Sequence, residues 1–219
     1  MSDACCDGSA ERAAALAARH RGVLWAVLAI NLGLFAVEAV AGVRAGSSAL
    51  LGDSLDMLGD SLVYAASLYV VGRGARAQAG VAVGKGLLMG ALAVGVVVDA
   101  VMRVAAQAPP SSLAVAVVGA LALAGNCACF ALLYRHRGDN LNFRSTWLCS
   151  RNDLIANVAV LASAALVAAT LSPWPDALVG AGLAALWLRT SRRVLAEALQ
   201  GELVTQPRPA TRVRVDDAR

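Results

Sequence analysis

The sequence predicts an all-α, polytopic membrane protein with six transmembrane helices and both termini in the cytoplasm. The 219 residues are 58% hydrophobic and only 16% charged, which is too apolar for a soluble domain of this length. Apolar runs of roughly 20 residues, each long enough to cross about 30 Å of hydrocarbon, recur along the chain. The basic residues gather in alternate connections between these runs, as they do in proteins of fixed membrane orientation.

The apolar runs divide the chain into a membrane region and two short ends. Residues 1–21 are expected to form a cytoplasmic arm, 22–200 a six-helix transmembrane domain, and 201–219 a short, disordered cytoplasmic tail. The first twenty residues lack the apolar centre of a cleaved signal peptide, so the first run is expected to be retained as a helix. The predicted helices cover residues 23–43, 47–71, 86–106, 113–134, 145–171 and 177–199.

Orientation follows from the basic residues of the short connections. With six spans, the basic residues of the connections fall on one side, except for Arg44 on the opposite side. The positive-inside rule therefore places both termini in the cytoplasm. Because these arginines are scattered over loops and not interleaved with aromatic residues, the net charge of +4 does not indicate nucleic-acid binding. The basic residues on the predicted cytoplasmic side are Arg12, Arg19, Arg21, Arg73, Arg76, Lys85, Arg135, Arg137, Arg144, Arg192 and Arg193.

Two predicted helices carry ionisable side chains at the spacing of one helical face. In "GDSLDMLGD", Asp56 and Asp60 are four residues apart, and in "CSRND" so are Cys149 and Asp153. Each charged group at the centre of a bilayer costs on the order of 2.5–3.5 kcal/mol, so a compensating proton or cation is needed. Three carboxylates and one thiolate provide the four ligands of a tetrahedral divalent site, and the thiolate favours zinc or cadmium.

Other polar residues within the spans allow more than one interpretation. Asp53, Asn31, Glu38 and Asn157 are candidates for supporting the ligands or carrying protons. For Asp53 a purely structural hydrogen-bonding role is an equal alternative, and for Glu38 it is the favoured one. Asp99 has Arg103 four residues on, which predicts a local ion pair. Cys127 and Cys129 point to different faces of a helix and are interpreted as small packing residues.

At these residues the sequence resembles the cation diffusion facilitator family of divalent-metal transporters. The stretches "GSSALLGDSLDMLGDSL", "CSRND" and "WPDALVGAGLAALWL", which begins beside Asp176, are similar to that family's second, fifth and sixth helices. Asn31 and Glu38 suit its first helix. The resemblance covers roughly residues 20–200. It implies a six-helix protomer, usually a homodimer, that exports a divalent cation in exchange for protons by alternating access.

Three departures from the family pattern bear on these expectations. The family's usual cytoplasmic C-terminal domain has no counterpart after Gln200, so we expect a short form with a less secure dimer. A His-rich loop is replaced by "YRHRGDNLNFRS". Cys149 stands where the family typically has a histidine, which leaves the choice between Zn²⁺ and Cd²⁺ open. No cofactor is expected beyond the transported metal.

The N-terminal arm contains two adjacent cysteines. Cys5 and Cys6 could capture a soft metal ion, or they could belong to a tail without a specific role. An intramembrane metalloenzyme is disfavoured because the spans contain no His and no H-E-x-x-H motif. A non-transporting membrane sensor or assembly protein remains the alternative to a transporter. The Ala-, Val-, Gly- and Arg-rich composition with a single Lys is typical of GC-rich bacteria, so we expect the bacterial inner membrane.

Overall fold

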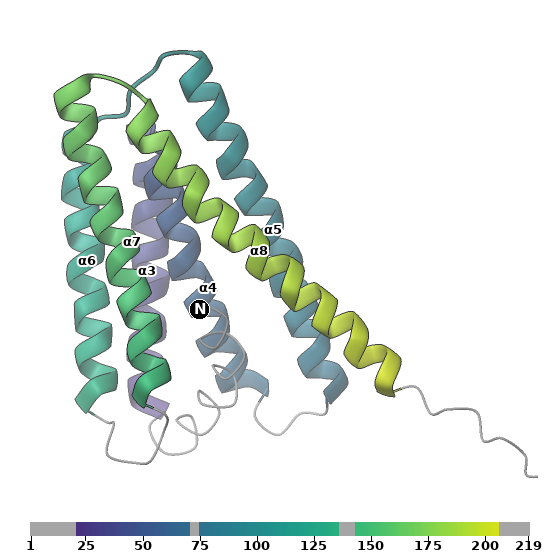
Figure 1. Cartoon of the computed structure of the whole chain (residues 1–219). Helices are drawn as coiled ribbons and strands as arrows, with labels where there is room; N and C mark the ends of the chain where they lie inside the picture. The colour runs from purple at the N-terminus through teal and green to yellow at the C-terminus, as the bar shows by residue number, and fades with distance from the viewer. Residues whose placement is uncertain (1–20, 71–74, 136–142, 206–219) are drawn as a thin grey trace, which may run out of the picture.

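The computed structural model describes the backbone of residues 21–70, 75–135 and 143–205. In these ranges the elements of secondary structure are all helices, joined by short connections (Figure 1), which confirms the all-α prediction. Asp99 is paired with Arg103 and Cys129 is buried, as the sequence predicts, whereas Cys127 is exposed and is not the packing residue that was expected. The helices are α3 (Arg21–Ala45), α4 (Ser48–Val70), α5 (Ala75–Ala105), α6 (Ser112–Arg135), α7 (Phe143–Thr170) and α8 (Trp174–Thr205).

The helix ends agree with the predicted ranges to within three residues, with two exceptions: α8 continues to Thr205, six residues past its predicted end and into the predicted tail, and α5 starts early. This helix begins at Ala75 and not at residue 86. Its additional turns contain Ala, Arg and Gln, which favour helix but are too polar to register as part of an apolar run. As a consequence Lys85, which the sequence analysis assigns to a connection, lies within a helix.

Within the described ranges, four helices are long and apolar enough to cross a membrane by themselves, namely α3, α5, α6 and α7. In the other two, charged residues interrupt the apolar stretch: α4 has three aspartates within eight residues, and α8 contains Asp176 and several arginines. The central place of α4 explains how its acids are tolerated. It contacts α3, α5, α7 and α8, so its polar side chains can be kept from lipid.

Three short connections lie together at one end of the bundle, which we call the turn end: residues 46–47, 106–111 and 171–173. The opposite end, with the starts of α3, α5 and α7, is called the loop end. Most consecutive helices are neighbours, as expected, but α5 packs mainly along α8 and α4 (Figure 1). Toward the loop end, α5 and α8 lean away from α3, α6 and α7 as a pair.

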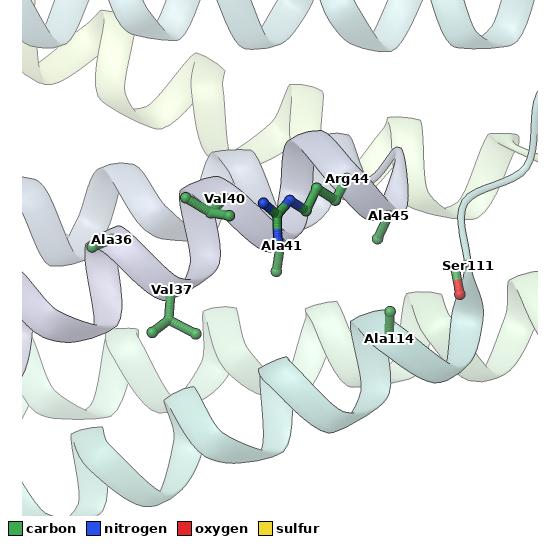
Figure 2. Close-up of a pocket in the computed structure, with 8 residues that line it drawn as sticks. All are labelled: Ala36, Val37, Val40, Ala41, Arg44, Ala45, Ser111 and Ala114. Atoms are coloured by element: carbon green, nitrogen blue, oxygen red, sulfur yellow. The ribbon is translucent and has the colours of Figure 1, made fainter.

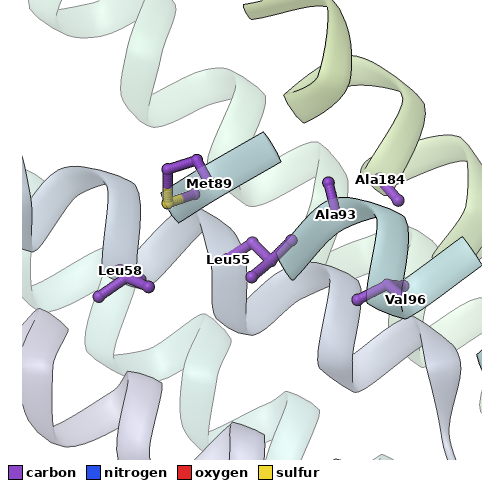
Figure 3. Close-up of a cluster of buried hydrophobic side chains, with 6 residues drawn as sticks. All are labelled: Leu55, Leu58, Met89, Ala93, Val96 and Ala184. Atoms are coloured by element: carbon purple, nitrogen blue, oxygen red, sulfur yellow. The ribbon is translucent and has the colours of Figure 1, made fainter. Parts of the chain in front are cut away.

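A cluster of buried apolar side chains joins this pair to α4 (Figure 3). Leu55 and Leu58 of α4 meet three residues of α5 and Ala184 of α8. Small residues bring α5 and α8 close, since a Cβ on Gly86 would lie 3.1 Å from Leu195 and one on Gly90 would lie 2.6 Å from the Ser191 hydroxyl. Such positions provide close packing where lipid removes the hydrophobic driving force between helices. The α5 members of the cluster are Met89, Ala93 and Val96.

The turn between α3 and α4 is fixed by backbone geometry. Gly46 has a φ of 72°, and the Ser47 amide donates to the Gly42 carbonyl over 2.9 Å, which is the Schellman arrangement of a helix C-terminus. A Cβ at Gly46 would also lie 2.6 Å from the Arg103 guanidinium. Glycine is therefore required here both for its conformation and for space.

Asp176, in the first turn of α8, caps the N-terminus of α4. Its carboxylate accepts hydrogen bonds from the amides of Ser48 (2.6 Å) and Ala49 (3.2 Å) and from the Ser47 hydroxyl (2.5 Å). All four residues are buried. The carboxylate thus satisfies amides that the start of any helix leaves without a partner.

A second carboxylate extends this polar cap to α5. The Ser48 hydroxyl donates to Asp99 over 2.8 Å, and the Arg103 guanidinium donates to the same Asp99 oxygen over 2.7 Å. Gly180 of α8 lies directly against the Ser48 backbone, where a Cβ could not fit. The turn end therefore joins α4, α5 and α8 through buried polar contacts.

Candidate metal centre

Asp56 and Asp60 lie near the middle of α4, one helical turn apart. Both side chains are partly exposed, whereas their neighbours Leu55, Met57 and Leu58 are buried. An acid that reaches solvent from inside a helix bundle can exchange ions with it. The two carboxylates therefore meet the first requirement of a transport site.

Asp153 of α7 is brought to the same place. Its carboxyl group and that of Asp56 lie in hydrogen-bonding contact, and the charge of Asp60 acts on it as well. Two carboxyl groups can share a hydrogen bond only if one of them carries a proton. The structure thus brings Asp153 of α7 against Asp56 of α4, with Asp60 one turn further along α4.

Cys149 lies one turn before Asp153 in α7, but its side chain is outside the described residues, as are Cys5 and Cys6. Among the side chains that the structure does describe, no three carboxylates, thiols or imidazoles are gathered closely enough to hold one ion. The thiol ligand and the metal-capturing arm stay predictions. What the structure shows is a pair of acids in contact with a third acid nearby.

Lys85 of α5 is a charged group of this site that the sequence analysis missed. Its positive charge acts on both Asp56 and Asp60. Lys85, Met89 and Ala93 follow at four-residue spacing on one face of α5, and the last two are buried against α4. An earlier start of the predicted helix would have placed Lys85 on this inward face.

Deeper in the bundle, buried amides surround Asp53. Asn157 of α7 donates to both Asp53 oxygens, over 3.1 and 3.0 Å, and accepts from Asn126 of α6 over 3.3 Å. Asp53 therefore has the structural hydrogen bonds that one of its two interpretations predicts. Asn31 lies apart from this group, since it donates to the Val27 carbonyl (2.9 Å) and to the Cys129 sulfur (3.6 Å).

The favoured interpretation of Glu38, a structural hydrogen-bond partner, is wrong. It is fully buried, and neither of its oxygens has a partner among the described residues. The charged groups that act on it, Asp53 and Asp56, are themselves acids, and an ionised carboxylate offers no donor.

A groove between α3 and α6 near the turn end has a volume of about 600 Å³ (Figure 2). It contains one charged side chain and no carboxylate or thiol, so it offers nothing to a divalent cation. Its exposed valines suit contact with lipid. The lining residues are Ala36, Val37, Val40, Ala41, Arg44, Ala45, Ser111 and Ala114.

A helical bundle with four membrane-spanning helices and several acids enclosed between them defines an integral membrane protein of the ion-transporting class. The particular family follows from sequence comparison. The model of the cation efflux transmembrane domain matches residues 24–201, so the chain belongs to the cation diffusion facilitator family, whose members transport divalent cations. No curated protein matches the chain.

Proposed function

We propose that this protein exports Zn²⁺ or Cd²⁺ from the cytoplasm in exchange for protons, with Asp56, Asp60, Cys149 and Asp153 as the metal ligands. The observation that supports the proposal is the contact between the Asp56 and Asp153 carboxyl groups, which joins α4 to α7. Metal and proton compete for such a pair, because carboxylates and thiolates must lose their protons to bind metal.

The exchange then follows from which side of the membrane the site faces. When the site is open to the cytoplasm, the metal displaces protons from the acids. When the bundle exposes the site to the outside, protons displace the metal and return on the same groups. The protein is expected to act as a homodimer in the bacterial inner membrane, with Cys5 and Cys6 delivering the soft ion.

The first test is metal-driven proton flux in proteoliposomes that contain the full chain. Asp60→Ala and Asp153→Ala should each abolish the flux, because both remove a ligand. Asp99→Asn is the matched control, since it changes a carboxylate of a membrane helix that lies in the turn-end ion pair and away from the ligands. Flux that persists in both ligand variants would refute the assignment. Metal binding without any flux in the wild type would indicate the sensor or assembly protein instead.

The second test concerns the choice of metal. Cys149→His should move the ratio of zinc to cadmium transport toward zinc, because imidazole is a harder ligand than thiolate. Cys127→Ala, at an exposed position on α6, is the control for losing a cysteine. An unchanged ratio after Cys149→His would show that the thiol does not bind the transported ion.

A further inference from the structure

The groove between α3 and α6 has one polar end and one apolar end. Arg44 and Ser111 lie at the turn end, and alanines and valines line the rest. Its α3 side runs over residues 36–45, which rise ~14 Å at 1.5 Å per residue. That length is about half of the ~30 Å of hydrocarbon in a bilayer. The groove therefore has the length and the polarity of a single leaflet.

The hollow exists because α3 and α6 are close at one end and lined by small side chains at the other. Toward the loop end the two helices touch, since a Cβ on Gly125 would lie 2.5 Å from Leu34. Toward the turn end α6 packs on α4 and α7 through Val115. The space left there, about 600 Å³, is within the size range of ligand pockets. Four of the eight lining residues are alanine, namely Ala36, Ala41, Ala45 and Ala114.

Arg44 is the charged group of the groove. It is exposed, and no described carboxylate forms an ion pair with it. Its side chain runs back along α3 toward Val40 and Ala41 (Figure 2), in the direction that helical side chains favour. The guanidinium therefore lies over the apolar walls and not in the water beyond the helix end. A cation in that place is costly unless an anion joins it.

A lipid phosphate is the anion that a bilayer supplies at this depth. Guanidinium binds phosphate through paired hydrogen bonds, and the Ser111 hydroxyl at the same end of the groove is a further donor. The lining contains no carboxylate that could pair with the ammonium group of a zwitterionic headgroup. An anionic headgroup therefore suits the groove better than a zwitterionic one.

The turn end does not offer a second copy of the chain a carboxylate for Arg44. Asp99 is paired with Arg103, and Asp176 is buried against the start of α4. These are the acids that the described residues place at this end of the bundle. The exposed walls of the groove, with Val37 at 42% and Val40 at 51%, suit an acyl chain.

We propose that the groove between α3 and α6 binds one anionic phospholipid, with its phosphate at Arg44 and an acyl chain along the alanines and valines. The site lies on α3 and α6, whereas the proposed metal ligands lie on α4 and α7. Lipid binding can be measured without transport, so failure of this inference would leave the proposed function standing.

The experiment titrates phosphatidylglycerol into the purified full-length protein in a neutral detergent and counts bound lipids by native mass spectrometry. The wild type should bind one phosphatidylglycerol about tenfold more tightly than phosphatidylcholine with the same chains. Arg44→Gln should lose this preference, because an amide carries no charge to pair with the phosphate. Arg192→Gln, at an exposed arginine of α8 outside the groove, is the matched control and should keep it.

A second variant tests the apolar part of the groove. Ala114→Phe fills the space and leaves the charge in place, so it should weaken phosphatidylglycerol binding about tenfold. Leu113→Phe, at a neighbouring position that is 74% exposed and outside the groove, should change little. Inorganic phosphate at the concentration of the lipid should not displace it, because a free ion gains nothing from the apolar walls.

Each contrary outcome overturns the inference. A preference for phosphatidylglycerol that survives in Arg44→Gln would do so, and this exposed substitution keeps the test valid even if Ala114→Phe does not fold. Displacement by inorganic phosphate would indicate a site for a small anion. If Ala114→Phe separates a dimer that phosphatidylglycerol does not affect, the groove holds a second copy of the chain and the lipid assignment is wrong.

Discussion

Replacing Asp176 should weaken the attachment of α8 to α4 by an amount that follows from its hydrogen bonds. In Asp176→Ala the amides of Ser48 and Ala49 and the Ser47 hydroxyl lose their acceptor in a buried place. Loss of a helix cap costs about 0.5–2 kcal/mol, and each buried donor left without a partner costs about 1–3 kcal/mol. Because local relaxation recovers part of this energy, we expect a total loss of about 2–5 kcal/mol.

The assay is reversible unfolding in mixed detergent micelles, with helix content measured at increasing denaturing detergent. Asp176→Asn keeps one acceptor oxygen and should lose about half as much stability as Asp176→Ala. Thr170→Ala is the control, because this hydroxyl is exposed and bonds only to its own helix, at the Leu166 carbonyl. A change below about 0.5 kcal/mol for Asp176→Ala, the range of an ordinary surface substitution, would refute the argument.

Three further predictions use the same contacts. Gly180→Ala should destabilise the protein by about 1–3 kcal/mol in the unfolding assay because the new methyl group meets the α4 backbone, while Gly182→Ala, with open space around it, should change little. Asn157→Leu should cost about 1–3 kcal/mol by leaving Asp53 without a donor, and adding Asp53→Leu should recover most of that loss; no recovery would contradict the pairing. Lys85→Gln should tighten Zn²⁺ binding about tenfold in calorimetry by removing a competing charge, and weaker binding would show that the amine does not oppose the metal.

Features that depend on one helix could be predicted from the sequence. The ion pair of Asp99 with Arg103 follows from four-residue spacing, and its two side chains meet at 2.7 Å. The helices themselves follow from the length of the apolar runs. The spacing of Asp56 and Asp60 likewise indicates a common face, although it cannot show which helix lies opposite.

Features that depend on two helices could not be predicted in this way. The hydrogen bonds of Asp53 to Asn157 join residues 104 positions apart, and no local pattern specifies them. The same limitation makes the prediction for Glu38 wrong, because the absence of a partner is a property of the surrounding helices. Lys85 was placed in a connection for another reason, because the polar first turns of α5 resemble a loop in composition.

The close pairing of α5 with α8 has a mechanical consequence. These helices contact the remaining bundle mainly through α4 and α7. A tilt of the pair as one body would therefore pivot on α4. Helices α5 and α8 contain 31 and 32 residues, so each is ~47 Å long and a tilt of ~10° would move the far end by ~8 Å. Lys85 lies on α5 and would move with the pair, while Asp56 and Asp60 lie on α4. A tilt of α5 and α8 would therefore change the distance from the Lys85 amine to Asp56 and Asp60. The shape and the charge of the binding site would change together.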